Sequence, residues 1–234
     1  MFFAGCKADV MTSSIFNFAH TEVLIHDIQN LVSTEALHVD VFDSVISQKL
    51  NYSEADAFFF EIDTPEAISD SIELIKKIRQ TNQRACIFIL ITHTKPFSSI
   101  NCYIAGADHC IKIPSNRLVK EKLLSSSLEE SHWKKPISLY LDRTRLLLHN
   151  NISKLEISYT EMTIIDALIQ APEYVMTQDK IAKTLDPNIV FYDPRALEKT
   201  ISRLRTKIKK AYNVELILSV RAYGYRLRRA TIID

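Results

Sequence analysis

The stretch from Asp193 to Tyr225, DPRALEKTISRLRTKIKKAYNVELILSVRAYGY, decides the fold of the C-terminal part of the chain. It begins with Asp193 and Pro194, a helix start in which the carboxylate accepts backbone N–H groups and the proline occupies the first helical position. At about 100° per residue, the apolar side chains that follow fall in one narrow stripe. The stripe consists of Leu197, Ile201, Leu204 and Ile208. The sequence therefore predicts a helix with one buried face.

The opposite face of this helix is basic and carries no acid. It gathers Arg195, Lys199, Ser202, Arg203, Thr206 and Lys210, with Arg205 and Lys207 on its flanks. A solvated helix face usually mixes charge signs, so a face of one sign favours a polyanionic partner. An aliphatic run from Glu215 to Val220 comes next, and the residues from Arg221 to Leu227 predict a hairpin that turns near Gly224. A basic helix followed by a basic hairpin fits a helix in the DNA major groove and a wing against the adjacent minor groove.

These residues also resemble a known family. The helix from Arg195 to Lys207, with Arg-Leu-Arg at its centre, and the run VRAYGYRL from Val220 to Leu227 are similar to the winged-helix effector domain of OmpR/PhoB-type response regulators. The resemblance implies that Arg203 contacts base edges, where a guanidinium can bind guanine with two hydrogen bonds. It also implies that a wing arginine enters the minor groove and that a wing tyrosine meets a phosphate. The predicted DNA-binding residues are Arg195, Lys199, Thr200, Ser202, Arg203, Thr206, Ser219, Arg221 and Tyr225.

The charge of the chain is divided between two halves. The 234 residues have a net charge of only +1, but residues 1–130 hold 11 Lys and Arg against 17 Asp and Glu, and residues 131–234 hold 18 against 11. A chain of this length is long enough for two domains, each with its own core. The sequence therefore predicts an N-terminal domain over 1–130, a linker over 131–136 and a basic DNA-binding domain over 137–234.

Cysteine spacing and hydropathy exclude several classes of protein. The chain has no Cys-x-x-Cys pair, which argues against a disulfide or zinc framework, and no apolar run reaches the roughly 18 residues of a membrane span. We expect reduced thiols, no membrane association, no metal or other cofactor, no enzymatic activity and a cytoplasmic location. Residues 1–20 are predicted to form a poorly ordered extension. The cysteines are Cys6, Cys86, Cys102 and Cys110.

The N-terminal half alternates strand-like and helix-like segments, which predicts a doubly wound (βα)5 domain with a parallel sheet. Continuous apolar runs such as Phe58 to Phe60 are typical of strands covered by helices on both faces. The predicted strands are Val23–Ile25, Val39–Phe42, Ala57–Ile62, Cys86–Thr92 and Asp108–Ile113. The predicted helices are Ile28–Leu37, Ser44–Leu50, Pro65–Gln80, Phe97–Ala105 and Asn116–Leu128.

This half resembles the receiver domain of response regulators. Gly106-Ala107-Asp108 matches the family's Gly-Ala-Asp before the fifth strand, Thr92 closes the fourth strand, and Pro114 follows the fifth. Gly106 and Gly224 are two of only three glycines in the chain, and both fall on motif positions. We expect a positive φ at both positions, because glycine adopts that conformation without steric cost.

The resemblance implies a phosphorylation site that is degenerate in this chain. A receiver needs an acidic pair after its first strand, and here Asp27 is the one acid left, because Ile28 holds the second position. Glu61 stands at the phosphoacceptor position and Ile113 stands where the family has a lysine. Cys110 replaces the usual switch aromatic, and Thr92 is retained. Because Mg²⁺ requires several oxygen ligands, the sequence predicts a receiver that works without phosphorylation.

Three interpretations of function remain open at this stage. The first is a DNA-binding transcription regulator that acts without phosphorylation, with Glu61 either imitating the phosphorylated state or simply drifted. The second is a conventional two-component regulator switched by phosphorylation of Asp63 or Glu61, with Lys112 serving as the lysine. The third is a basic adaptor for protein or RNA, and the lack of an aromatic stacking platform on the basic helix argues against RNA.

The family resemblance also implies partners. The receiver is expected to form a homodimer through residues 97–128, where Lys120 and Lys122 stand beside Asp108 and Glu121 and offer charges that pair across a two-fold axis. The segment from Asp186 to Tyr192 corresponds to the loop that contacts RNA polymerase in related proteins. Its apolar residues offer an alternative, which is to cover the local core.

The start of the basic half has its own helix signals. Three short strands are predicted over Ile137–Leu141, Arg145–His149 and Lys154–Ile157. Ser158 and Glu161 then form a capping box that opens a helix, and Thr177 is expected to cap the next one.

Overall fold

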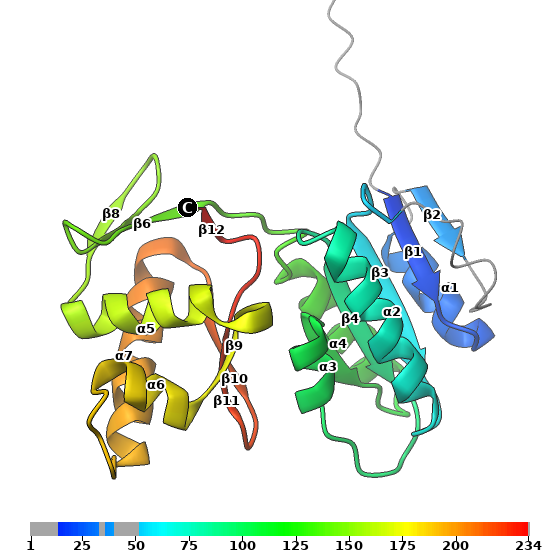
Figure 1. Ribbon diagram of the computed structural model, residues 1–234. Coiled ribbons are helices and arrows are strands. Elements are labelled where there is room, and N and C mark those ends of the chain that lie inside the picture. Colours follow the sequence, from blue (N-terminus) through cyan, green and yellow to red (C-terminus); the bar gives the residue numbers. More distant parts are fainter. Residues whose placement is uncertain (1–13, 33–35, 40–51, 234) are drawn as a thin grey trace, which may run out of the picture.

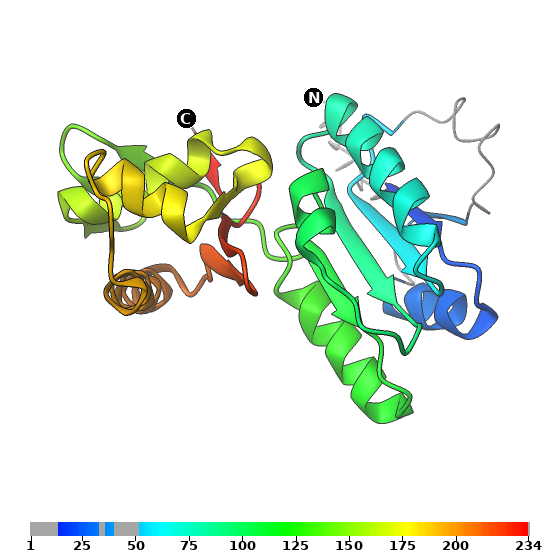
Figure 2. The ribbon, with the colours of Figure 1, turned by 60° about the horizontal axis from the view of Figure 1, so that its bottom comes forward.

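The computed structural model describes residues 14–32, 36–39 and 52–233. The helix predicted over 44–50 and Cys6 lie outside these residues. Figures 1 and 2 show the chain as two groups of elements side by side, joined by the segment that follows α4 (Arg117–Glu129).

The first group is built on a parallel five-stranded sheet of β1 (Ser14–Phe18), β2 (Ala36–Val39), β3 (Ala57–Ile62), β4 (Cys86–Ile91) and β5 (His109–Lys112). The strand order is β2-β1-β3-β4-β5, and every pair is parallel. Every residue of β3 and β4 is buried, as expected when helices cover both faces. This arrangement confirms the doubly wound, receiver-like fold.

Four described helices cover the sheet. The helices α1 (Glu22–Leu31) and α4 pack on one face, where Leu24 and Leu124 share a core cluster with Phe88. The helices α2 (Ala67–Thr81) and α3 (Ile100–Ala105) pack on the other face, where Ile75 and Cys102 share a second cluster. The helices predicted over Pro65–Gln80, Phe97–Ala105 and Asn116–Leu128 are confirmed, although α3 is shorter than predicted. The bounds predicted for the first helix, Ile28–Leu37, are wrong, because α1 spans Glu22–Leu31 and Ala36 begins β2.

The prediction of the first strand is wrong. Residues Val23–Ile25 lie in helix α1, and β1 is formed by Ser14–Phe18, inside the stretch predicted to be a poorly ordered extension. The reason is packing: Phe16 and Phe18 are each 5% exposed and stack on the aromatic side chains of β3, whereas Val23 is 60% exposed. Strand β2 consequently begins at Ala36, earlier than the predicted Val39.

The second group contains two small sheets and three helices. Strands β6 (Leu139–Asp142), β7 (Leu147–His149) and β8 (Lys154–Glu156) pair antiparallel, and β12 (Ile232–Ile233) adds to β6 in parallel. The helices are α5 (Tyr159–Gln170), α6 (Gln178–Leu185) and α7 (Pro194–Tyr212). The second sheet has the order β10-β11-β9, formed by Ile217–Val220, Gly224–Leu227 and Val175–Thr177. A short 3-10 turn, η2 (Pro172–Tyr174), links α5 to β9.

The predicted helix caps are confirmed. The Ser158 hydroxyl accepts a hydrogen bond from the Glu161 amide at 3.2 Å, and the Glu161 carboxylate accepts one from the Ser158 amide at 2.8 Å. Thr177 accepts from the Lys180 amide at 3.2 Å and so caps α6. These side chains occupy donors that an α-helix leaves without partners in its first turn.

The two motif glycines have different structural roles. Gly106 has a φ of +112°, as predicted, and closes α3. The prediction for Gly224 is wrong, because Gly224 begins strand β11 and the residue with positive φ in the turn is Ala222, at +58°. Glycine is required at 224 by close approach instead, since a Cβ there would lie 2.2 Å from the carbonyl oxygen of Met176 on β9.

Within the ranges that the structure describes, no helix has both the length and the apolar character needed to span a bilayer.

Candidate functional site

Helix α7 has the two faces that the sequence predicts. The Asp193 side chain accepts a hydrogen bond from the Arg195 amide at 2.9 Å, and Pro194 occupies the first turn. Leu197, Ile201, Leu204 and Ile208 are buried in the core that α7 shares with α5 and β11. Asn213 ends the helix in the left-handed conformation. Burial of one stripe fixes the rotation of α7, and therefore which side chains face solvent.

The face of α7 turned to solvent carries the predicted DNA-binding side chains. Thr200 is half-buried, and its hydroxyl donates to the Ala196 carbonyl within the helix. Within the described part of the chain, the basic side chains of Arg195, Lys199 and Arg203 form no ion pair with a carboxylate. These cations are therefore available to a phosphate or a base edge. The exposed members of the predicted set on α7 are Arg195, Lys199, Ser202, Arg203 and Thr206.

The flanking cations of α7 are engaged within the protein. Arg205 lies over the ring of Tyr225 at 5.3 Å from its centroid and donates to the Ser219 hydroxyl at 2.9 Å. Lys207 forms an ion pair with Glu161 at 2.7 Å, which ties α7 to the capping box of α5. These contacts orient α7 against β10 and β11 and against α5.

The wing lies between β10 and β11. Arg221 and Ala222 are exposed in the turn, and Ser219 is exposed on β10. The expectation for Tyr225 requires correction, because Tyr225 is 5% exposed and its ring belongs to the core of this domain. Tyr225 positions Arg205 by ring contact and offers little surface to a phosphate.

In the receiver-like half, the carboxylate of Glu61 is surrounded by hydrogen-bond donors. One oxygen, Oε2, accepts hydrogen bonds from the backbone amides of His20 at 3.0 Å and Thr21 at 2.9 Å. The other, Oε1, accepts from the hydroxyls of Thr21 at 2.5 Å and Thr92 at 3.1 Å. Burial raises the pKa of Glu61, but these hydrogen bonds outweigh it and hold the pKa below its ordinary value. Glu61 is therefore ionised, buried and fully partnered.

The prediction that Asp27 remains from the acidic pair is wrong. Asp27 lies on α1, where it forms an ion pair with Lys120 of α4 at 2.5 Å, and Ile28 is buried in the core. The residues that follow β1 are Ala19, His20 and Thr21, so this site has lost both acids. The cause of the error is the misplaced first strand, which shifted the alignment onto α1.

The surroundings of Glu61 do not supply a magnesium site. His20 lies between Glu61 and Asp63, and its Nε2 is 2.8 Å from the Asp63 carboxylate. This contact is the first cause of the lowered pKa of Asp63. In residues 14–32, 36–39 and 52–233, the grouping of His, Cys, Asp and Glu with metal-ligand spacing lies elsewhere. Both oxygens of Glu61 already accept hydrogen bonds and Asp63 is paired with His20, so neither carboxylate is free to bind Mg²⁺.

The position of the family lysine is also altered. Ile113 follows β5 and packs against the core cluster of α1 and α4. Lys112 is exposed, and its Nζ donates to the carbonyl of Thr94 at 3.4 Å. Cys110 is half-buried on β5. No described lysine therefore pairs with Glu61, and the interpretation in which Lys112 takes that role is not favoured.

One buried cluster has residue types that bind metals. Cys86, Asp108 and His132 place possible ligand atoms within 4.8 Å of one another. Both carboxylate oxygens of Asp108 are occupied, because Arg79 donates to Oδ2 at 2.7 Å and Arg229 donates to Oδ1 at 3.3 Å. Burial also raises the pKa of the Cys86 thiol well above its ordinary value. A neutral thiol beside two guanidiniums does not favour a cation here.

Comparison with known proteins agrees with this geometry. Residues 153–227 match the family described as "Transcriptional regulatory protein, C terminal". The transcriptional regulatory protein PhoP of Escherichia coli strain K12 is 24% identical over 183 residues, which cover 75% of this chain and 80% of PhoP. AfsQ1 of Streptomyces coelicolor, also a transcriptional regulatory protein, is 23% identical over 164 residues, which cover 68% of this chain and 72% of AfsQ1.

These similarities support an OmpR/PhoB-family response regulator. The chain is a transcription factor of the response-regulator type with a DNA-binding C-terminal domain. Among solved structures, the response regulator DrrB of Thermotoga maritima, described as an OmpR/PhoB homolog, is similar with a TM-score of 0.44 and 16% identity. That similarity covers 93% of this chain and 99% of DrrB.

Sequence reasoning missed the residues by which this response regulator joins its two halves. Arg226, Arg228 and Arg229 are 7%, 6% and 4% exposed, although they follow one another in a basic run that suggests a solvated or DNA-facing surface. Arg229 bridges Asp108 and Glu173, at 3.3 and 2.6 Å. The only signal in the sequence is the alternation of Arg226 and Arg228 around the core residue Leu227, which places both arginines on one face. It does not indicate what covers that face.

Proposed function

We propose that this protein is a sequence-specific DNA-binding transcription regulator whose receiver domain works without phosphorylation. The observation that carries the proposal is the donor set around Glu61, in which four hydrogen bonds from His20, Thr21 and Thr92 already satisfy a fixed negative charge. In the family resemblance, Thr92 stands at the position that responds to the phosphoryl group. Here its hydroxyl is held by the Glu61 carboxylate.

The length and charge of the Glu61 side chain support a permanently hydrogen-bonded arrangement at this site. Glu61 has one methylene more than aspartate, so its carboxylate extends further from the strand. It reaches the hydroxyl of Thr92 and the amides after β1 without an added group. Charge-assisted hydrogen bonds of this kind are about twice as strong as neutral ones, and removal of one partner from a buried set is costly. A transferred phosphoryl group would have to displace these donors, and no described lysine offsets its charge.

The test combines DNA selection with a phosphorylation assay. The purified, unphosphorylated full chain is used to select bound fragments from random duplexes, and the selected duplex is then titrated with and without Mg²⁺ and acetyl phosphate. We expect the same affinity under both conditions and no labelling of the protein. Labelling at Glu61 or Asp63 together with a gain in affinity would overturn the proposal.

Two variants and one competitor sharpen this test. Asp63→Asn removes the alternative acceptor, whose side chain is 43% exposed, and is expected to leave DNA binding unchanged. Glu61→Asp shortens the side chain, withdraws the carboxylate from Thr92 and is expected to weaken binding. An RNA duplex of the selected sequence is expected not to compete, and competition by RNA would favour the adaptor interpretation.

We also propose that the protein forms a homodimer through residues 97–128, but with different contacts from those expected. Asp108 is 3% exposed and paired with arginines of its own chain, and Lys120 is paired with Asp27, so neither is available to a partner. Exposed apolar side chains support the proposal instead, since Leu118 and Val119 on α4 are 77% and 53% exposed. Burial of such side chains contributes about 25 cal/mol per Å².

Sedimentation of the full chain tests this proposal. Leu118→Glu is expected to shift the equilibrium toward monomer, because dimerisation would bury an unpaired charge. Val23→Glu is the matched control, since Val23 is 60% exposed on α1, outside the proposed interface, and this variant is expected to dimerise normally. A monomeric wild-type chain at high micromolar concentration would contradict the proposal.

The loop between α6 and α7 supports a further partner, RNA polymerase. Val190 and Phe191 are 83% and 92% exposed, so the alternative in which they cover the local core is wrong for these two residues. Tyr192 is held by a hydrogen bond of 2.7 Å from its hydroxyl to Asp179. Two exposed apolar side chains on an anchored loop suit a protein contact.

We place this DNA-binding protein in the cytoplasm, with residues 1–130 as the receiver-like domain, 131–136 as the linker and 137–234 as the effector domain.

A further inference from the structure

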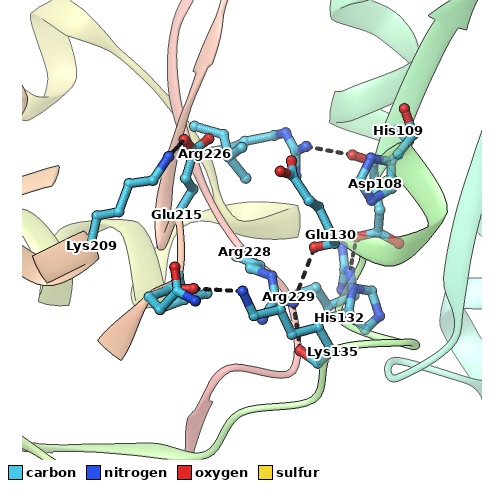
Figure 3. Close-up of a pocket in the computed structure, with 14 residues that line it drawn as sticks. Asp108, His109, Glu130, His132, Lys135, Lys209, Glu215, Arg226, Arg228 and Arg229 are labelled. Atoms are coloured by element: carbon cyan, nitrogen blue, oxygen red, sulfur yellow. Dashed lines mark hydrogen bonds and ion pairs between the residues drawn. The ribbon is translucent and has the colours of Figure 1, made fainter. Parts of the chain in front are cut away.

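A cavity of about 190 Å³ lies where the receiver-like and effector domains meet (Figure 3). One side of the cavity is formed by the receiver-like domain. It is lined by Asp108, which directly precedes β5, by His109 at the start of β5, and by Glu130, which follows α4. His132 and Lys135 line it from the linker. The effector side includes the arginines at the end of β11 and just after it. These are Arg226, Arg228 and Arg229.

Some charged groups of the cavity are neutralised by near neighbours. Arg229 is paired with Asp108 and with Glu173 of η2, and Asp108 is also paired with Arg79. Lys209 of α7 is paired with Glu215 at 2.7 Å. These pairs leave no net charge in their part of the wall.

Arg226 and Arg228 are different, because they are buried without an acidic partner. Among the described residues, no carboxylate forms an ion pair with either guanidinium. Arg228 donates to the backbone carbonyls of Lys135 at 2.7 Å and Glu130 at 3.2 Å. Arg226 donates to the backbone carbonyl of Asp108 and lies over the ring of Tyr103 at 4.8 Å from its centroid, while its buried Nε has no hydrogen-bond partner.

Such an arrangement is unfavourable in an isolated protein. A buried cation without a counter-charge is unfavourable unless an anion or strong acceptors compensate it. The two histidines of the wall add no charge, because burial lowers the pKa of His109 to about 3 and also lowers the pKa of His132. Glu130 lines the cavity and is exposed, but it does not form an ion pair with Arg226 or Arg228. The wall of the cavity therefore carries an excess of fixed positive charge.

We propose that this cavity is a binding site for a small anionic metabolite that bears carboxylate or phosphate groups, with Arg226 and Arg228 as its anchoring residues. The guanidinium fork binds the oxygens of either group with paired hydrogen bonds. A volume of about 190 Å³ leaves room for a small polyatomic anion, since one water occupies about 30 Å³ of liquid. The proposal does not depend on whether the receiver is phosphorylated.

A ligand in this position would act on the arrangement of the domains. Its contacts come from β5 and Glu130 on one side and from β11 on the other, so the complete site exists only while the domains are docked. A ligand that binds one arrangement stabilises that arrangement by mass action. The anion would therefore hold the effector domain against the receiver.

The full chain carries an internal reporter for the test. Trp133 is the only tryptophan of the protein and stands next to His132 in the linker. We would titrate the dialysed protein with inorganic phosphate, succinate and citrate at constant ionic strength, follow Trp133 fluorescence, and confirm the stoichiometry by calorimetry. We expect saturable binding of at least one probe at one site per chain. Arg226→Met is expected to weaken it roughly 10- to 100-fold, since hydrogen bonds to a charged group contribute that much.

Two further variants separate this site from general attraction of anions. Arg145→Met removes an exposed cation of the effector domain whose side chain is 77% exposed, and it is expected to leave the affinity unchanged. Glu130→Gln removes a negative charge from the rim and is expected to tighten binding severalfold, which tests the site even where Arg226→Met fails to fold. Absence of saturable binding by all three probes, or equal losses in Arg226→Met and Arg145→Met, would overturn the proposal. A Glu130→Gln variant with unchanged affinity would also count against it.

Discussion

At the scale of single residues, two charged positions carry the proposed functions of the two halves. Arg203 stands on the exposed face of α7 without an internal partner, and Glu61 stands at the end of β3 with four donors. Both side chains are charged, but they differ in whether the protein itself binds the charge. A charge left free at the surface is available to DNA, whereas a charge saturated by buried donors fixes the local structure.

Replacement of Arg203 by alanine tests base recognition. We expect Arg203→Ala to lose about 1 to 3 kcal/mol on the preferred duplex and to relax specificity at one base pair, because a bidentate contact to guanine is removed. Lys199→Ala, on the same face, is expected to weaken all sequences alike and to flatten the salt dependence by about one unit. Titrations of both variants on selected and scrambled duplexes at several salt concentrations measure the difference. An equal loss on both duplexes for Arg203→Ala would contradict its assignment.

Replacement of Glu61 by glutamine tests the receiver site. Because the pKa of Glu61 lies below its ordinary value of 4.5, the folded protein prefers the ionised form. Its contribution to stability is fully present above pH 4.5 and is lost as the pH falls through the lowered pKa. We expect Glu61→Gln to lower the free energy of unfolding by about 1 to 3 kcal/mol at pH 7, with a smaller difference in acid. Urea denaturation without Mg²⁺ measures this; equal stability at pH 7 would show that the donor set contributes nothing.

At the scale of elements, the periodicity of the sequence predicts a helix correctly where one face of that helix is buried in the core of its own domain. The stripe of α7 and the caps at Ser158, Thr177 and Asp193 follow from local sequence, and all are found in the structure. The first strand fails for the opposite reason. Val23–Ile25 is an apolar run too short to distinguish a strand from a helix, and only the aromatic packing of Phe16 and Phe18 on β3 decides in favour of Ser14–Phe18.

The wing provides a test at this scale. Gly224→Ala is expected to lower the free energy of unfolding by about 1 to 3 kcal/mol, because its Cβ would meet backbone atoms of Met176 and Thr177 at 2.2 and 2.8 Å. Ala222→Gly is the matched variant in the same turn. It is expected to be neutral or slightly stabilising, since it relieves a positive φ of +58°. Thermal denaturation of the two variants measures both effects, and a Gly224→Ala variant as stable as wild type would show that the β9 to β11 approach is looser than described.

At the scale of the whole molecule, a buried polar network determines how the two domains meet. Asp108 accepts from Arg79 of its own domain and from Arg229 of the effector domain, 121 residues away in sequence. The guanidiniums hold the pKa of Asp108 well below its ordinary value against the opposing effect of burial. Figure 2 shows the C-terminal hairpin on the side of the effector domain that faces the receiver-like domain.

Removal of the Asp108 charge is expected to be costly. Asp108→Asn leaves the buried Arg79 without its carboxylate, and breaking a buried ion pair on one side typically costs about 3 to 5 kcal/mol. Glu121→Gln, which removes an exposed ion pair with Arg117 on α4, is expected to leave stability unchanged. Chemical denaturation of the full chain compares them. If Asp108→Asn is as stable as Glu121→Gln, the network does not hold the domains together.

The sequence by itself determined the elements whose pattern is local: the two-faced α7, its caps, and the buried runs of β3 and β4. It determined these because helix rotation, capping and strand burial depend on residues a few positions apart. Only the tertiary structure decided that β1 precedes Val23 and that Asp27 joins α1 to α4 by an ion pair. It also decided that Tyr225 is buried and that the arginines at the end of β11 and just after it face the receiver-like domain. Each of these features depends on packing between residues distant in sequence. The pattern of one segment shows which of its side chains share a face, but it does not show which other segment packs on that face.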